Sequence, residues 1–175
     1  MNPFSRTQVG VALGMAFGLL VTTLAFAWPS LPIIPQDEGA RIGLWLAVSV
    51  SVATWLLIGI ALLARYRFFN SADINGGAFG DGTGGARLLQ ALIQNSLEQV
   101  VLAIPAYGAW VWLAPEGRRG LVVICAALFS LGRLLFFLGY RFGAAARAPG
   151  FTLTFYPTVG LYIFLLPRIF SQLFG

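Results

Sequence analysis

Amide and carboxylate side chains gather within one otherwise apolar stretch of the sequence, ALIQNSLEQVVLAIPAYGAW, residues 91–110. Residues three, four and seven apart share one face of a helix, so Gln94, Asn95 and Glu98 are expected to lie together. A carboxylate inside a membrane helix is unfavourable unless it faces protein or water and finds a partner. The pattern therefore indicates a polar network that either joins neighbouring helices or lines a binding site.

The next apolar stretch carries a cation of its own, in SLGRLLFFLGYRF. Arg133 and Tyr140 are seven residues apart and are expected on one side of a helix. Because Glu98 needs a partner of opposite charge, Arg133 is the partner that the sequence predicts for it. Asn95 is expected to face the same helix and to meet Arg133 as well. On the residues alone, these segments are two helices joined by buried polar groups that could also line a site.

Residue types that are missing or rare exclude several kinds of chemistry. The sequence has no histidine and a single cysteine, Cys125, which lies in the apolar run LVVICAALF. Ser-His-Asp and Cys-His catalysis and the usual mixed zinc sites are thereby excluded, and we expect no metal site. We expect Cys125 to be a buried, unreactive thiol. The net charge is +5, every basic residue is an arginine, and this small excess fits membrane-flanking anchors, so no nucleic-acid partner is expected.

The composition places these helices in a bilayer. Hydrophobic residues make up 58% of the chain and charged residues 10%, with a mean hydropathy of +0.83; soluble domains have roughly 45–50% and 25%. A bilayer core of about 30 Å requires about 20 mostly apolar residues per helix. The sequence therefore predicts an all-α integral membrane protein with five spanning stretches: Val9–Trp28, Arg41–Ala64, Leu88–Ala114, Leu121–Tyr140 and Phe151–Phe170.

Connecting segments and arginines define the expected organisation. Proline, glycine and charged residues in WPSLPIIPQDEGA, APEGRRG and RFGAAARAPG are read as helix stops. Residues 1–40 are then an N-terminal transmembrane helix with an external loop, and residues 41–175 are a four-helix membrane domain. Short cytoplasmic loops are enriched in arginine. This favours a cytoplasmic N-terminus in a multi-pass protein of the bacterial inner membrane, with Arg6, Arg65, Arg67, Arg87, Arg141 and Arg147 inside and Arg41, Arg118, Arg119 and Arg168 outside.

Two local motifs have competing interpretations. Ala25-Phe26-Ala27 is similar to a signal-peptidase site, but the apolar run before it is longer than a typical signal core, which favours a retained helix. Glycines at positions 10, 14 and 18 form a stripe that would let another helix approach closely. Gly80, Gly82 and Gly85 satisfy G-x-G-x-x-G, but they follow a predicted membrane helix rather than a strand, which favours a connector over a dinucleotide site.

The polar motifs, taken in order, resemble those of the MAPEG family, the membrane-associated proteins in eicosanoid and glutathione metabolism. In that family one membrane helix carries Asn-x-x-Glu before an apolar run with proline, which Asn95 and Glu98 match. The next helix carries an arginine and, seven residues later, the tyrosine of a Gly-Tyr pair, which Arg133 and Tyr140 match. A further arginine follows after seven residues, ahead of a Gly-Phe pair, and Arg147 matches it. The resemblance covers roughly residue 41 to the C-terminus.

The resemblance implies a fold and an activity. It implies a MAPEG-like four-helix bundle per subunit, here with one additional N-terminal helix, assembled into a homotrimer with active sites between neighbouring subunits near the cytoplasmic face. Glutathione would be the co-substrate, and a lipophilic small molecule would enter from the lipid bilayer. Arg147 takes the position of the residue that stabilises the thiolate, and four further residues would shape the thiol's pocket: Asn95, Glu98, Arg133 and Tyr140.

Two residues depart from the pattern of catalytic members. Ala91 stands where those members usually have an arginine, and Phe136 stands where they often have a tyrosine. Arg87, one turn before Ala91, is the candidate substitute for glutathione binding. Two functions therefore stay open. One is a glutathione-dependent transferase or peroxidase acting on lipophilic electrophiles or lipid hydroperoxides; the other is a non-catalytic structural or interaction protein of the membrane.

Overall fold

The computed structural model describes residues 5–28, 37–76, 80 and 82–174. Within them the chain forms five long helices: α1 (Arg6–Ala27), α2 (Glu38–Phe69), α3 (Gly84–Leu113), α4 (Leu121–Gly139) and α5 (Ala144–Phe174). Short 3-10 turns lie between them: η1 (Ser71–Asp73), η3 (Glu116–Arg118) and η4 (Tyr140–Phe142). The described residues contain no strand, which confirms the predicted all-α class.

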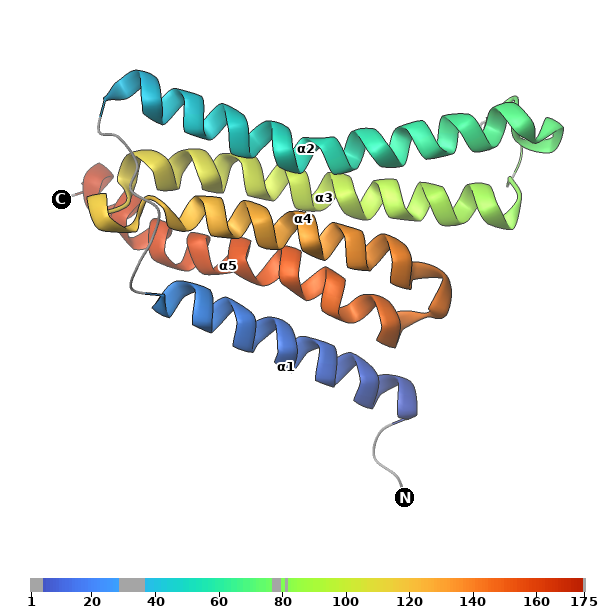
Figure 1. Cartoon of the computed structure of the whole chain (residues 1–175), viewed down its shortest axis with the longest axis horizontal. Helices are drawn as coiled ribbons and strands as arrows, with labels where there is room; N and C mark the ends of the chain where they lie inside the picture. Colours follow the sequence, from blue (N-terminus) through green and yellow to red (C-terminus); the bar gives the residue numbers. More distant parts are fainter. Residues whose placement is uncertain (1–4, 29–36, 77–79, 81, 175) are drawn as a thin grey trace.

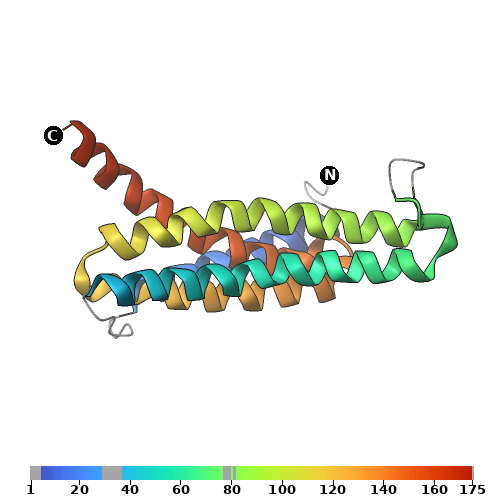
Figure 2. The same cartoon turned by 90° about the horizontal axis from the view of Figure 1, so that it is seen from above.

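Helices α2 to α5 form one antiparallel bundle, and α1 packs on its outside. α2 lies beside α3, α4 lies beside α5, and α1 covers the outer side of α5 (Figure 1). The main apolar core is shared by α2 to α5 and includes Val52, Tyr107, Leu121, Phe129 and Leu161. At the end where α2 meets α3, these two helices extend beyond α4 and α5 (Figures 1 and 2).

Four helical segments are long and apolar enough to cross a membrane: α1, α2, α5 and the segment Glu116–Phe142 that contains α4. The chain is therefore a multi-pass membrane protein. The described part of α3 is also long, with 30 residues, but it is not among these four. The reason is the more polar character of α3, which carries the side chains of Gln94, Asn95 and Glu98.

The glycine stripe of α1 packs against α5, as the sequence predicted for an approaching helix. A methyl group added at Gly14 would lie 2.8 Å from Cβ of Ala148, and one added at Gly18 would collide with Thr152. The Thr152 hydroxyl donates a hydrogen bond of 3.0 Å to the backbone oxygen of Gly14. Because glycine has no side chain, the two backbones come close enough for this bond to form.

The start of the last helix differs from the prediction. RFGAAARAPG was read as a helix stop before Phe151, whereas α5 begins at Ala144 and contains Pro149. The break lies earlier, at Gly143, whose positive φ of 96° suits glycine. Pro149 removes only one hydrogen bond near the start of the helix. The consequence is that Arg147 lies within α5 rather than on a loop.

A polar clasp joins the end of α2 to the start of α3. The Thr83 backbone N–H and hydroxyl donate to the two carboxylate oxygens of Asp73, at 2.8 and 2.7 Å. The Thr83 hydroxyl proton is thereby used, so Tyr66 of α2 donates to the Thr83 oxygen at 3.0 Å. The hydrogen bonds from Thr83 hold the pKa of the buried Asp73 carboxyl below its ordinary value. Among the described residues here, Gly82 and Gly85 follow helix α2 and turn η1, not a strand.

Candidate functional site

Close contact between α4 and α5 brings the candidate residues together. A methyl group added at Gly132 would lie 2.7 Å from the backbone oxygen of Gly150, and one added at Gly139 would lie 2.5 Å from that of Ala146. Gly150 of the Pro149-Gly150 pair therefore lies where the backbones of α4 and α5 pack closely. Because the two backbones touch here, the end of α4 and the first turns of α5 present their side chains to one shared space.

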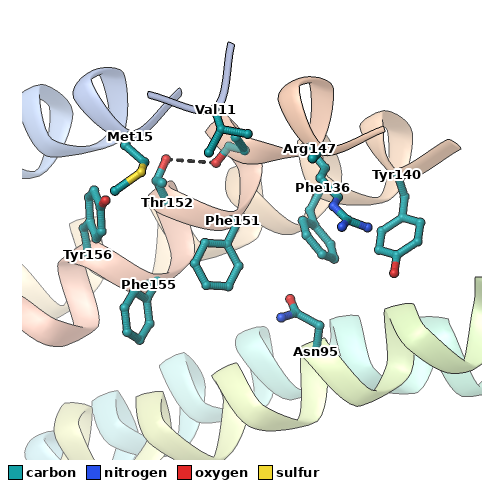
Figure 3. A pocket seen from close by; sticks show the side chains of 12 residues that line it. Val11, Met15, Asn95, Phe136, Tyr140, Arg147, Phe151, Thr152, Phe155 and Tyr156 are labelled. Atoms are coloured by element: carbon teal, nitrogen blue, oxygen red, sulfur yellow. Dashed lines mark hydrogen bonds between the residues drawn. The ribbon is translucent and has the colours of Figure 1, made fainter. Parts of the chain in front are cut away.

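That space is a cavity of about 550 Å³ at the end of the bundle where α1 and α5 begin (Figure 3). Most of its wall comes from α5: Ala144, Arg147, Ala148, Phe151, Thr152, Phe155 and Tyr156. The rest comes from four other elements. Phe136 and Tyr140 lie at the end of α4 and the start of η4, Asn95 lies on α3, and Val11 and Met15 lie on α1.

Arg147 and Tyr140, two of the predicted site residues, are in direct contact at this cavity. The guanidinium carbon of Arg147 lies 4.5 Å from the centre of the Tyr140 ring. This cation–π contact orients a half-buried guanidinium beside the cavity rather than toward bulk water. The ring of Phe136 packs edge to face against Tyr140, with centroids 5.3 Å apart. The arrangement can hold one anionic group next to aromatic surface.

Arg133 lies behind the cavity and is the most deeply buried cation of the described residues, with 0% of its surface exposed. It donates to the side-chain oxygen of Asn95 at 2.9 Å and to the Thr154 hydroxyl at 2.7 Å. Its guanidinium carbon also lies 4.5 Å from the centre of the Phe136 ring. This network ties α3, α4 and α5 together and fixes the orientation of Asn95 at the cavity wall.

The predicted pairing of Arg133 with Glu98 is wrong for the single chain. Within the described residues, Arg133 bonds to Asn95 and Thr154, and Glu98 instead accepts a hydrogen bond of 3.0 Å from Gln94. The reason is helix geometry. Asn95 faces α4, whereas Gln94 and Glu98 are four residues apart and share a neighbouring, exposed face of α3.

The remaining predicted residue, Arg87, lies at a different place. It lines a smaller hollow of about 140 Å³ at the α2–α3 clasp, together with Arg67 and Asp73, and donates to the backbone oxygen of Gly82 at 3.2 Å. The single chain thus brings Asn95, Tyr140 and Arg147 to the cavity, with Arg133 behind them. Glu98 and Arg87 do not line it.

Sequence reasoning missed several groups that build the site. The Thr154 hydroxyl accepts a second hydrogen bond from Arg133. The four-residue spacing of Phe151 and Phe155 on α5 was the available signal for a shared aromatic face. Val11 and Met15 on α1 carried no such signal. Their contribution depends on the docking of α1 against α5, which only the structure reveals.

Comparison with known protein families gives a match. The model of the MAPEG family matches residues 43–166, which includes α3, α4 and most of α2 and α5. No curated protein and no solved structure matches the chain. The matched region contains all the predicted site residues and leaves α1 outside.

Proposed function

The chain belongs to the MAPEG family, and from this premise we propose that it is a glutathione-dependent transferase or peroxidase acting on lipophilic electrophiles or lipid hydroperoxides. The observation that supports the proposal most is the position of Arg147. Its guanidinium stacks on Tyr140 at the wall of a largely apolar cavity. One cation beside an apolar space fits a reaction between a polar thiol and a lipophilic partner.

The proposed role of Arg147 is to stabilise the glutathione thiolate. A free thiol has a pKa of about 8.5, so little of it is ionised at neutral pH, and a nearby guanidinium favours the ionised form. In the transferase reaction the thiolate sulfur attacks an electrophilic carbon, a C–S bond forms, and the displaced electron pair stays on the leaving or ring-opened atom. Arg147 would be the catalytic residue, with Asn95 and Tyr140 as positioning and binding groups.

Glu98 supports the proposed assembly into a homotrimer. It lies exposed on α3, beside apolar residues such as Leu97 and Val101 that are also exposed. A carboxylate turned toward lipid is unfavourable, so a neighbouring subunit is the expected cover for this face. A site between subunits would then add Glu98, and groups of the neighbour, to the residues that one chain brings together. We place the cavity at the cytoplasmic face, because Arg65, Arg67, Arg87, Arg141 and Arg147 lie at that end.

The decisive experiment compares Arg147→Ala with Arg141→Ala in the detergent-purified full chain. Arg141 is a matched control, since its exposed guanidinium stacks on the neighbouring Phe142 ring, outside the cavity. We expect wild type and Arg141→Ala to bind glutathione by calorimetry and to show thiolate absorbance in the ultraviolet. Arg147→Ala should lose the thiolate signal while keeping the assembly of the wild type. An equal thiolate signal in all three proteins would reject the proposed mechanism.

Two residues favour a second candidate, a non-catalytic interaction protein. Phe136 lacks the hydroxyl that catalytic members often carry at this position, and its ring already packs against Arg133 and Tyr140. Ala91 lacks a guanidinium. If wild type fails to bind glutathione at millimolar concentration, this second function replaces the first.

A further inference from the structure

We infer that the Ala27–Trp28 bond is a latent cleavage site for a signal peptidase, and that Arg118 of η3 keeps α1 attached to the bundle by holding the end of this helix. Cleavage would be a hydrolysis, in which water adds across the peptide bond and leaves a carboxylate on Ala27 and an amine on Trp28. α1 would then be separated from the rest of the chain. Val11 and Met15, which line the Arg147 cavity, would no longer be tied to it.

The residues before this bond are of the types that a signal peptidase selects. Ala25 and Ala27 are the small residues of an A-x-A site, and the apolar stretch of α1 precedes them. The end of α1 that carries this motif lies at the opposite end of the bundle from the Arg147 cavity (Figure 1). With that cavity at the cytoplasmic face, as proposed above, the motif lies at the outer face, where signal peptidases act.

The structure holds the motif at a capped helix end. α1 continues to Ala27, and the Trp28 backbone N–H donates to the Ala25 oxygen at 3.4 Å. The last carbonyl groups of a helix have no partners within the helix. Here the Arg118 guanidinium donates to the backbone oxygen of Phe26 and, at 3.4 Å, to that of Trp28. These two oxygens flank the Ala27–Trp28 bond, and a cation beside them also stabilises the negative end of the helix dipole.

Both sides of this contact are anchored to the bundle. The Trp110 indole N–H donates to the Arg118 backbone oxygen at 2.9 Å, which fixes η3 on α3. The Phe26 ring stacks on Phe164 of α5, with centroids 5.7 Å apart, and meets the Trp110 ring edge to face at 6.4 Å. The end of α1 therefore cannot open without breaking contacts with α3, α5 and η3.

Opening of the helix end controls access to the Ala27–Trp28 bond. Both residues are exposed, so the closed helix end protects the bond rather than burial of their side chains. Proteolysis acts on locally opened backbone, and its rate follows the population of the open form when opening is fast. A hydrogen bond to a charged group stabilises more than a neutral one, so loss of the Arg118 side chain should raise this population about tenfold or more.

The test uses the full chain, purified in detergent and incubated with a purified bacterial signal peptidase. Arg118→Ala should be cut at least about tenfold faster than wild type, and mass spectrometry should find a product that begins at Trp28. Adding Ala27→Leu to Arg118→Ala replaces the small residue before the bond and should abolish this product. Arg168→Ala is the matched control. Arg168 donates to the Leu113 backbone oxygen at 2.7 Å, so this variant removes an arginine–carbonyl bond from the end of α3 instead of α1.

Equal cleavage rates in wild type and Arg118→Ala would overturn the inference. An equal gain in Arg168→Ala would do the same, since it would reflect general loosening of the bundle. In bacterial membranes, wild type should keep α1, whereas part of Arg118→Ala should begin at Trp28; a variant that is cut in detergent but keeps α1 in the membrane would refute the role of Arg118. None of these measurements involves glutathione, so their failure is distinct from a failure of the proposed activity.

Discussion

The buried guanidinium of Arg133 donates a hydrogen bond of 2.9 Å to the side-chain oxygen of Asn95, and this contact links two motifs that lie 38 residues apart in the sequence. It gives the Asn-x-x-Glu motif of α3 a structural role in the single chain. This hydrogen bond from Arg133 to Asn95 offsets part of the free-energy cost of burying the Arg133 cation between α3, α4 and α5. Glu98 lies on a neighbouring, exposed face of α3, where it accepts a hydrogen bond from Gln94.

Removing Asn95 should destabilise the protein. In Asn95→Leu the buried guanidinium keeps its hydrogen bond to Thr154 but loses its bond to α3. An unsatisfied buried polar group costs about 1–3 kcal/mol, so a lower free energy of unfolding of this size is expected. Arg133→Met should also destabilise, and the double variant should be more stable than the sum of the single effects predicts.

Thermal and denaturant unfolding in detergent, followed by circular dichroism, measures these effects. Thr54→Val is a suitable control, because this exposed hydroxyl bonds only to the Val50 backbone oxygen of its own helix. Strictly additive effects of the two substitutions would contradict a direct contribution of the Arg133–Asn95 contact to stability.

The sequence predicted that Asn95 and Glu98 would both meet Arg133; the contact with Asn95 is confirmed, and Glu98 bonds to Gln94 instead. The helical spacing placed Asn95 and Glu98 correctly on one helix, α3, and Arg133 on another, α4, with Tyr140 directly after the end of α4. The choice between Asn95 and Glu98 as the partner of Arg133 depends on the rotation of α3 about its axis. Asn95 and Glu98 are three residues apart, so they point in similar but not identical directions around the axis of α3. Spacing alone does not determine which of the two faces α4.

Packing also explains the other differences. Pro149 and Gly150 are typical of the end of a helix, yet they lie inside α5, where the glycine lets that helix touch α4. The contribution of α1 to the cavity depends on contacts between residues more than a hundred positions apart, such as Gly14 and Thr152. A glycine stripe predicts that a helix will approach, but it does not identify the helix.

The stripe itself gives a second prediction. Gly18→Ala should lower the melting temperature, since the added methyl group collides with Thr152 and overpacking costs about 1–3 kcal/mol. Gly43→Ala on α2 is the matched control, because a methyl group there meets no atom within 4 Å. That substitution should leave stability unchanged or raise it. Equal melting temperatures for the two variants would mean that α1 does not pack on α5 as described.

The clasp at the α2–α3 end predicts a dependence of stability on pH. Hydrogen bonds from Thr83 lower the pKa of Asp73 in the folded protein. The clasp therefore makes its full contribution to the stability of the fold at a pH above the unfolded-state pKa of about 3.9. This contribution is lost as the pH falls through the lower, folded-state pKa. Asp73→Asn should therefore melt at a lower temperature than wild type at neutral pH, and the difference should shrink at strongly acidic pH. A difference that grew on acidification would have the wrong sign for this mechanism.

Restoring the missing hydroxyl should strengthen thiol binding. Phe136 lines the cavity between Arg133 and Tyr140, and catalytic members of the family often carry a tyrosine at this position. In Phe136→Tyr the new hydroxyl can donate to an anionic ligand, and a hydrogen bond to a charged group contributes about 1.5–3 kcal/mol. Glutathione affinity measured by calorimetry should therefore rise by about tenfold or more. Phe151→Tyr adds the same group to another wall of the same cavity and should have little effect. An equal gain in both variants would show only that a more polar cavity binds glutathione better, and no gain in Phe136→Tyr would mean that the thiol does not lie beside this ring.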